Sequence, residues 1–209
     1  GIPDFRSVDG LYSQKYDQPP ETILSHTYFV GHTGDFYRFY RDKMLCLDAK
    51  PNAAHQKLAQ LERAGRLKAV VTQNIDGLHQ MAGSQVVYEL HGSVHRNYCT
   101  KCRAFYGADF IQTGEGVPLC PVCGGLVKPD VVLYEEGLDQ DTVEGAVRAI
   151  AKADVLIVGG TSLYPAAGLI DYYQERKLVL INRDPTPYDG RADLVIHDSI
   201  GKVLGGIEV

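Results

Sequence analysis

Two pairs of cysteines offer the clearest chemistry in this sequence. Cys99 and Cys102 form one CxxC pair, Cys120 and Cys123 form another, and residues 103–119 separate the two. Two such pairs at this separation can bring four thiolates to the corners of one tetrahedron, the geometry that a structural zinc ion prefers. Because sulfur fills all four positions, we expect one structural Zn that folds the segment and performs no chemistry.

The four cysteines have two other interpretations, a pair of disulfides and a thioredoxin-type redox CxxC. The first needs an oxidising compartment, and the second needs a βαβ setting that this segment lacks. We therefore predict zinc binding, and reduced cysteines imply an intracellular, cytoplasmic protein. The fifth cysteine, Cys46, falls on a predicted helix and is expected to be a buried thiol.

One histidine stands where a catalytic base could act. His91 follows a predicted strand over residues 86–90 and precedes Gly92, so its imidazole lies at a strand end and could work near its unperturbed pKa. The alternative is a structural hydrogen bond, the usual role of a lone histidine. We expect that structural role for the other six, His26, His32, His55, His79, His95 and His197.

Glycine and short polar residues after two further predicted strands suggest a dinucleotide. Gly160, Thr161 and Ser162 follow one strand, and Asn182 follows the next. Glycine lets a backbone approach phosphate or ribose closely, and short polar side chains bond ribose hydroxyls. The signal is weak by itself, because such turns also serve packing and the usual GxGxxG fingerprint does not occur in this sequence.

Hydrophobic periodicity predicts the elements that must hold these residues. Residues 35–47 have helical spacing, Asn52 can cap a second helix that Gly65 ends, and the apolar run 67–72 is typical of a buried parallel strand. The alternation then returns, with helices over 141–153 and 166–175, strands over 154–160, 178–182 and 194–197, and a last helix. This order implies an α/β protein with a doubly wound parallel sheet, whose ligands bind at the carboxyl ends of the strands.

Four predicted strand ends carry polar or glycine residues, with the sequences TQNID, GGTS, INRD and HDS, and we expect them to line one crevice. Residues 94–128 break the alternation and contain all four paired cysteines. We therefore expect a small zinc-binding module inserted into the sheet domain.

The composition is that of an ordinary globular protein. Of 209 residues, 44% are hydrophobic and 22% are charged, which excludes disorder, collagen and coiled coil. The net charge of −5 offers no general attraction for nucleic acid, and no apolar run is long enough to span a membrane. We expect neither nucleic acid nor a membrane as partner, whereas a basic peptide remains possible. Nothing in the sequence specifies an oligomeric state.

Several motifs together resemble the sirtuins, which are NAD-dependent protein lysine deacylases. They occur in the family's order and rough spacing: GIPDFRS (1–7), TQNIDGLH (72–79), HG (91–92), the paired CxxC, GTSL (160–163) and LIN (180–182). The resemblance implies a Rossmann-type NAD-binding domain over 1–93 and 129–209 and the zinc module over 94–128. It also implies a cleft for NAD and an acyl-lysine peptide, and the helical part of the small domain is expected from about residues 10–50.

The resemblance also implies roles near the nicotinamide end of NAD. His91 matches the catalytic base, and Gln73, Asn74 and Asp76 match residues that hold the ribose and the nicotinamide amide. Asn74 and Asp76 are expected to share in catalysis. A loop that closes over nicotinamide is matched by Ile2, Asp4, Phe5 and Arg6. Phe5 and Ile75 could form the apolar wall that keeps water from the reactive ribose cation.

Other matched residues concern the rest of NAD and the peptide. Gly160, Thr161 and Ser162 match contacts to phosphate and the adenine ribose. Asn182, Arg183 and Asp184 match the adenosine-ribose turn, and Ser199 and Ile200 are expected beside adenine. The substrate backbone and the acyl-lysine tunnel are matched by Val131, Val132, Leu133, Tyr134, Glu135 and Glu136, with Ile75 and His91 also contacting the substrate.

The implied reaction transfers the acyl group of acyl-lysine to ADP-ribose. Nicotinamide leaves, the acyl oxygen attacks the ribose carbon, and His91 removes a hydroxyl proton so that lysine and O-acetyl-ADP-ribose are released. A protein mono-ADP-ribosyltransferase is an alternative, although ribosyl transfer does not need His91. A zinc-bearing module that only senses NAD is another, but it leaves His91, Asn74 and Asp76 without a shared role.

The sequence departs from the family pattern in three places. The glycine-rich GAGxS motif normally precedes GIPDFRS, so we expect the complete protein to carry it upstream of Gly1 and a fragment without it to bind NAD poorly. Where many relatives read VFFGE, residues 132–136 read VLYEE, and Glu135 either favours basic substrate flanks or is a solvated loop charge. In sirtuins that prefer acidic acyl groups, a tyrosine and an arginine three positions apart reach the end of the tunnel. Arg38 and Arg41 have this spacing but the tyrosine is missing, so we expect both arginines to lie on a solvated helix face.

Overall fold

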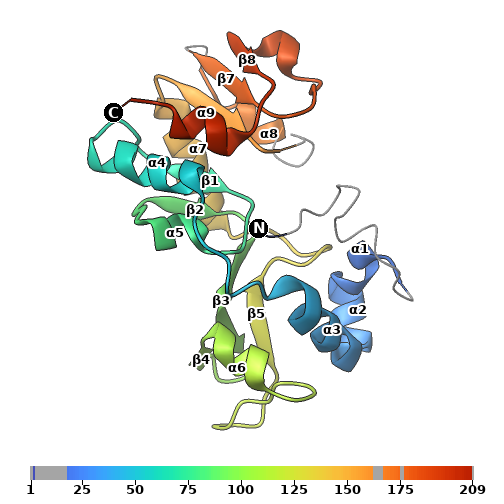
Figure 1. Cartoon of the computed structure of the whole chain (residues 1–209). Coiled ribbons are helices and arrows are strands. Elements are labelled where there is room, and N and C mark those ends of the chain that lie inside the picture. Colours follow the sequence, from blue (N-terminus) through green and yellow to red (C-terminus); the bar gives the residue numbers. More distant parts are fainter. Residues whose placement is uncertain (1, 3–17, 162–166, 175–176, 209) are drawn as a thin grey trace. The chain divides into compact units, whose positions relative to one another are not determined.

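The computed structural model describes residue 2 and residues 18–161, 167–174 and 177–208. The chain divides into two compact units, each described here by itself (Figure 1). The first unit comprises residues 1–50, 73–77 and 89–138, and the second comprises residues 51–72, 78–88 and 139–209. The predicted domain boundaries at residues 93 and 128 remain predictions.

Short helices around an aromatic cluster build one part of the first unit. They are α1 (Pro20–Ile23), α2 (His26–Gly31), α3 (Thr33–Phe39) and a π-helical turn (Tyr40–Met44). Phe29 packs edge to face on Phe36 at 4.8 Å between ring centroids, and Phe36 stacks on Tyr40 at 5.5 Å. All three rings are buried, so the predicted helical spacing over residues 35–47 reflects this core.

An antiparallel sheet forms the other part of the first unit. Its strand order is β4 (Phe105–Tyr106), β3 (Gly92–Cys99) and β5 (Val127–Val131), and α6 (Ala108–Thr113) connects β4 toward β5. Figure 1 shows β3 and β5 running side by side. In β5 the residues alternate between buried and half-buried, as expected for a strand with one face on the core.

The second unit contains the parallel sheet that the alternation of helix and strand predicts. Its order is β6 (Leu156–Gly159), β7 (Leu178–Ile181) and β8 (Leu194–Ile196), with α7 (Gln140–Lys152), α8 (Ala167–Ile170), a 3-10 turn (Asp189–Arg191) and α9 (Ile200–Gly205) around it. Gly159 pairs with Ile181, and Ile181 pairs with Ile196, so the three strands end at one edge. The α/β prediction is confirmed.

The helix predicted from Asn52 is α4 (Ala53–Arg63). The Asn52 side chain accepts from the Ala54 and His55 N–H groups, and the helix stops before Gly65, whose φ is +71°. The strand predicted over 67–72 is shorter than expected. It is β1 (Val70–Thr72), which pairs with β2 (Val87–Glu89) in a two-stranded sheet, and α5 (Leu78–Ala82) lies between them in sequence.

One smaller expectation, that of a buried Cys46, differs from the structure. Cys46 lies just after the π-helical turn and is only half-buried, because the helix ends at Met44 with Leu45 extended. Among the described residues, none of the helices combines the length and apolar character needed to cross a bilayer.

Candidate functional site

His91 lies between β2 and β3, and its ring is tied to the backbone. Nδ1 is 3.1 Å from the carbonyl oxygen of Gln73. A carbonyl oxygen only accepts hydrogen bonds, so neutral His91 carries its proton on Nδ1 and presents the lone pair of Nε2. Burial lowers the pKa of His91 below its ordinary value, although the bond to Gln73 acts in the opposite direction. The expectation of an unperturbed pKa is therefore wrong, because the half-buried ring is desolvated.

Residues 73–77, which connect β1 to α5, are held against β3. The Val94 N–H donates to Ile75 O at 3.0 Å, and His95 Nε2 is 3.0 Å from Asp76 O. Together with the bond from His91, these contacts fix three carbonyls of the loop. Asn74 is exposed, while Ile75 and Asp76 are half-buried. Gln73, Asn74, Ile75 and Asp76 are thus gathered beside His91 in one unit.

A partly buried ion-pair group holds the strands on either side of His91. Arg96 donates to Glu89 at 2.6 Å from Nη1 and to Asp130 at 2.7 Å from Nε. Glu89 precedes His91 by two residues, and Asp130 lies on β5 opposite Ser93. This group could not be predicted from the sequence, because its acids lie on different strands from Arg96 and share no local spacing with it.

Gly92 allows the strands to meet directly after His91. Its φ is +74°, and a Cβ at this position would stand 1.9 Å from the carbonyl oxygen of Asp130. No side chain other than hydrogen fits there, so the His-Gly pair places the imidazole at a point where two backbones are in close contact.

The segment 131–136 continues from β5 and is also anchored to this site. The Val132 N–H donates to His91 O at 3.0 Å. Lys128 Nζ donates to Val131 O at 3.1 Å and to Glu136 at 3.0 Å, and Glu136 accepts from the Leu133 N–H at 2.9 Å. Val131 and Leu133 are buried, whereas Tyr134 and Glu135 are exposed.

Glu135 has a partner within its own chain. Its Oε2 accepts from the Thr27 N–H at 2.9 Å and from the Thr27 hydroxyl at 2.7 Å. These hydrogen bonds hold the pKa of Glu135 below its ordinary value. Glu135 is therefore an exposed loop charge, as one of the two interpretations expects, but its carboxylate is also bonded to α2.

The predicted residues of the second unit meet at the carboxyl edge of its parallel sheet. Gly160 follows β6 with φ +63°, and its N–H donates to Ile181 O at 3.0 Å. Asn182 follows β7, and its N–H donates to Ile196 O at 3.1 Å. Parallel strands that end in register bring glycine and a short amide side chain together, which suits a ribose or phosphate.

The start of α9 reaches the same edge. A Cβ on Gly159 would stand 2.4 Å from Ile200 Cδ1, so that glycine is what lets α9 approach β6 closely. Ser199 caps α9. The Asn182 side chain donates to Asp184 O at 3.1 Å, which fixes the turn containing Arg183. Gly160, Asn182, Ser199 and Ile200 are therefore brought together, as the sequence predicts.

The four paired cysteines lie around one point. Their sulfur atoms are all within 4.8 Å of one another. Sγ of Cys99 is 3.4 Å from Sγ of Cys123, and Sγ of Cys102 is 3.6 Å from Sγ of Cys120. A tetrahedral zinc with Zn–S bonds of about 2.3 Å needs sulfurs about 3.8 Å apart. The donor set and its spacing therefore fit a four-sulfur zinc site.

Hydrogen bonds to the sulfurs of Cys99 and Cys120 favour the thiolate form that zinc requires. Cys99 Sγ accepts from the N–H groups of Lys101 and Cys102, each at 3.4 Å. The Tyr106 hydroxyl lies 3.0 Å from Cys120 Sγ and is the main reason that the pKa of Cys120 is lowered to about 6. A site with four sulfurs is closed, as a structural metal site should be.

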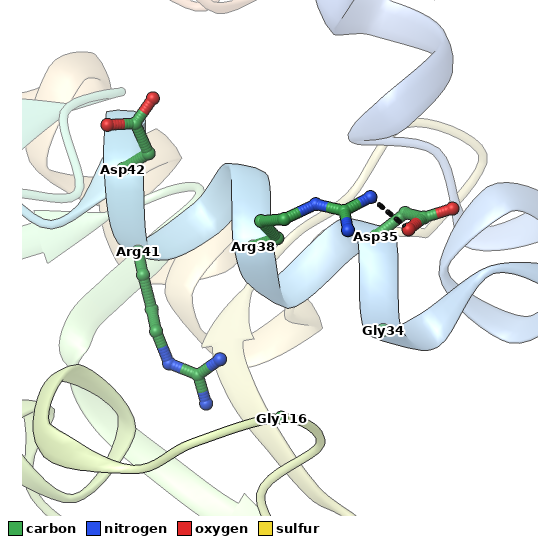
Figure 2. Close-up of a pocket in the computed structure, with 6 residues that line it drawn as sticks. All are labelled: Gly34, Asp35, Arg38, Arg41, Asp42 and Gly116. Atoms are coloured by element: carbon green, nitrogen blue, oxygen red, sulfur yellow. Dashed lines mark hydrogen bonds and ion pairs between the residues drawn. The ribbon is translucent and has the colours of Figure 1, made fainter.

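A cavity of about 590 Å³ lies elsewhere in the first unit (Figure 2). Gly34, Asp35, Arg38, Arg41, Asp42 and Gly116 line it. Arg38 is exposed and paired with Asp35, as expected for a solvated helix face. Arg41 differs from that expectation: Figure 2 shows it reaching toward Gly116, and its Nε donates to Ile111 O at 2.7 Å. The described lining contains none of the residues assigned to NAD or the peptide.

Some predicted residues lie outside the described part of the chain. They are Asp4, Phe5 and Arg6 of the nicotinamide loop and Ser162 of the phosphate turn. Ile2 is described and exposed, and Thr161 is half-buried.

Comparison with known proteins gives a consistent result. The model of the Sir2 family matches residues 1–166. The NAD-dependent protein deacetylase of Clostridium acetobutylicum is 62% identical over 208 residues, which cover 97% of this chain and 85% of that protein.

Solved structures agree with the sequence match. One is a Sir2 protein with deacetylated p53 peptide and 3'-O-acetyl ADP ribose, with a TM-score of 0.88 and 39% identity over 97% of this chain and 84% of the other. A second, with p53 peptide and NAD+, has a TM-score of 0.84 and 41% identity over 97% and 84% of the two chains. A family match over most of the chain, close relatives and the same fold lead to one conclusion: this chain belongs to the Sir2 family.

Proposed function

We propose that this chain is an NAD-dependent protein lysine deacetylase. It transfers the acyl group of an acyl-lysine protein or peptide to ADP-ribose and releases nicotinamide and O-acetyl-ADP-ribose. Relatives named NAD-dependent protein deacetylase at up to 62% identity, and similar structures with p53 peptide and NAD+, support this reaction.

The observation that carries the proposal is the state of His91. Its Nδ1 bond to Gln73 O directs the lone pair to Nε2, and burial keeps the ring neutral at physiological pH. A neutral imidazole with a fixed tautomer is suited to accept a proton from a ribose hydroxyl. We assign this role to His91.

The loop beside His91 supplies the neighbouring polar groups. We assign Gln73, Asn74 and Asp76 to the nicotinamide ribose and its amide, since contacts from His91, Val94 and His95 to three carbonyls hold this loop in place. Ile75, which packs against the core cluster, is the described residue suited to exclude water from the reacting ribose carbon.

The second unit supplies residues for the rest of NAD. Gly160 and Thr161 are assigned to phosphate and ribose, and Asn182, Arg183 and Asp184 to the adenosine ribose. Ser199 and Ile200 are assigned to adenine. NAD is consumed as a co-substrate and brings the ribose carbon that receives the acyl oxygen.

The remaining assignments concern the peptide, the metal and the compartment. Residues 131–136 bind the acyl-lysine peptide by strand addition. Cys99, Cys102, Cys120 and Cys123 hold one structural zinc, which folds the β3–β4–β5 sheet. Four thiols gathered for a metal imply reducing conditions, so we place the protein in the cytoplasm.

Mass spectrometry of one reaction tests the proposal. The full-length protein is incubated with an acetyl-lysine peptide and NAD. Free lysine peptide with O-acetyl-ADP-ribose is the expected result. Ribosylated protein would instead identify a mono-ADP-ribosyltransferase, and NAD binding without turnover would identify an NAD-sensing interaction module.

A further inference from the structure

The segment assigned to the peptide is fastened to the start of α2 by its backbone. The Tyr134 N–H donates to Leu24 O at 3.0 Å, and the His26 N–H donates to Tyr134 O at 3.0 Å. Ser25 and Tyr134 thereby form a parallel bridge. One edge of the segment is thus occupied by its own chain, as it would be by a neighbouring strand.

Glu135 adds a side-chain fastening at the same place. Thr27 is the second residue of α2, so its N–H has no acceptor within the helix. Glu135 Oε2 supplies one at 2.9 Å and also accepts from the Thr27 hydroxyl at 2.7 Å. The two residues are 108 positions apart in sequence, and their bond ties the peptide segment to the helical part of the first unit.

The backbone of Glu135 is strained, and the hydrogen bonds to Thr27 help to hold it in that conformation. Its φ is +75°, in the left-handed region that residues with a Cβ rarely adopt. A strained residue persists only where surrounding contacts hold it in place. The contacts to Thr27, and the Glu136 N–H donating to Leu133 O at 3.0 Å, are such contacts.

We propose that Glu135 is a positioning residue, whose carboxylate holds the peptide-binding segment in place through Thr27 and does not itself contact the substrate. The inference rests on the proposed function of residues 131–136. It replaces the hypothesis that Glu135 favours basic substrate flanks, because a carboxylate already bonded to two donors has less to offer a substrate lysine or arginine.

Steady-state kinetics of the full-length protein with acetyl-lysine peptides test the proposal. Glu135→Ala keeps the Cβ and so the backbone strain, but removes both bonds. We expect the KM for the peptide to rise about threefold to tenfold, while the KM for NAD stays unchanged. Glu135→Gln keeps an oxygen acceptor for Thr27 and should restore most of the affinity. Glu115→Ala, an exposed acid of the same unit, is the control and should behave as wild type.

A double-mutant cycle and hydrogen exchange test the fastening apart from catalysis. Adding Thr27→Val to Glu135→Ala should change the KM for the peptide little further, because Glu135→Ala has already removed the acceptor of the Thr27 hydroxyl. The Thr27 amide should exchange faster in Glu135→Ala and regain protection in Glu135→Gln. Exchange reports on the fastening even if wild type shows no turnover, which would count against the proposed function alone.

Three results would overturn the proposal. One is an unchanged Thr27 exchange rate in Glu135→Ala, which would show that the fastening does not form. Another is faster exchange without any change in the KM for the peptide. The third is a changed preference between basic and neutral peptide flanks in Glu135→Gln, since the carboxylate would then read the substrate.

Discussion

At the scale of single residues, the site depends on which atom of a side chain is already bonded. The role proposed for His91 as a base depends on Gln73 O, which occupies one ring nitrogen and leaves the other with its lone pair. Glu135 has the opposite situation, because Thr27 already occupies its carboxylate. A residue type alone therefore does not reveal whether its side chain acts on a ligand or on its own chain.

Replacing His91 by alanine should abolish deacetylation. Loss of a general base lowers the rate by about 10²-fold to 10⁴-fold, measured as kcat/KM by release of O-acetyl-ADP-ribose. Zinc content should stay at one ion per chain, because His91 is not among the cysteine ligands. His32→Ala, an exposed histidine of the same unit, serves as the control. Retained activity in His91→Ala would refute the assignment of the base.

The pH dependence of kcat/KM should show the lowered pKa of His91. The base is active only when neutral, and burial shifts its protonation to lower pH. Activity should therefore be retained as the pH falls through 6.5 and should decline only below that value, in a profile measured with a peptide lacking titratable flanks. An acid limb centred at or above 6.5 would contradict this expectation.

At the scale of elements, the antiparallel sheet of the first unit links the cysteine cluster to His91. β3 begins at Gly92, beside His91, and ends at Cys99, one of the four clustered cysteines. β5 pairs with both ends of β3, with Val131 opposite Gly92 and Val127 opposite Cys99. The β3–β5 pair thus places His91 and the cysteine cluster at opposite ends of one sheet. A substitution at either end should therefore affect the stability of the same sheet.

Gly92→Ala should destabilise the protein far more than the same substitution at a glycine with a similar φ. A Cβ at Gly92 would overlap Asp130 O, so we expect a loss of more than about 3 kcal/mol in the free energy of unfolding. Gly116 has φ +60° with open space around its Cβ position, and Gly116→Ala should cost about 1 kcal/mol. Urea denaturation measures both, and equal losses would contradict the predicted overlap.

Removal of zinc should unfold the antiparallel sheet. Structural zinc sites supply about 10–16 kcal/mol, which is comparable to the whole stability of a domain at about 5–15 kcal/mol. A strong chelator, or Cys120→Ser, should therefore abolish the β signal of this sheet in circular dichroism, and added Zn should restore it after chelation. Cys46→Ser is the matched control, because Cys46 is not in the cysteine cluster. Retention of the fold without metal would refute the structural role.

At the scale of the whole molecule, the chain passes repeatedly from one compact unit to the other. Residues 73–77 belong to the first unit, although the residues on either side of them belong to the second. As a result the residues assigned to NAD come from both units, His91 and Asn74 from the first and Gly160 and Asn182 from the second. The chain order of the motifs does not coincide with the division of the fold.

NAD binding should depend on Asn74 and on Asn182. Asn74→Ala in the first unit and Asn182→Ala in the second should each weaken binding about tenfold, because each loses a hydrogen bond to ribose or amide. Isothermal titration calorimetry of the full-length protein measures this, with Asp171→Ala, a surface partner of Arg191, as the control. Unchanged affinity in either variant would refute the assignment of that residue to NAD.

Much of the fold and the chemistry could be predicted from local patterns. The CxxC spacing, the Asn52 cap and the alternation of α7, β6, β7 and β8 depend on residues close in sequence, where residue type and period fix the outcome. The motif pattern identified the Sir2 family because it extends over nearly the whole chain.

Only the tertiary structure decided the contacts that join distant residues. The tautomer of His91, the bond of Glu135 to Thr27, and the bond of Arg41 to Ile111 involve partners that share no local spacing. β1 likewise pairs with β2 in a sheet of its own. The sequence determines which groups are present and which short elements carry them. Packing decides which of those groups bond to each other and which remain for a ligand, because it sets distances across the whole chain.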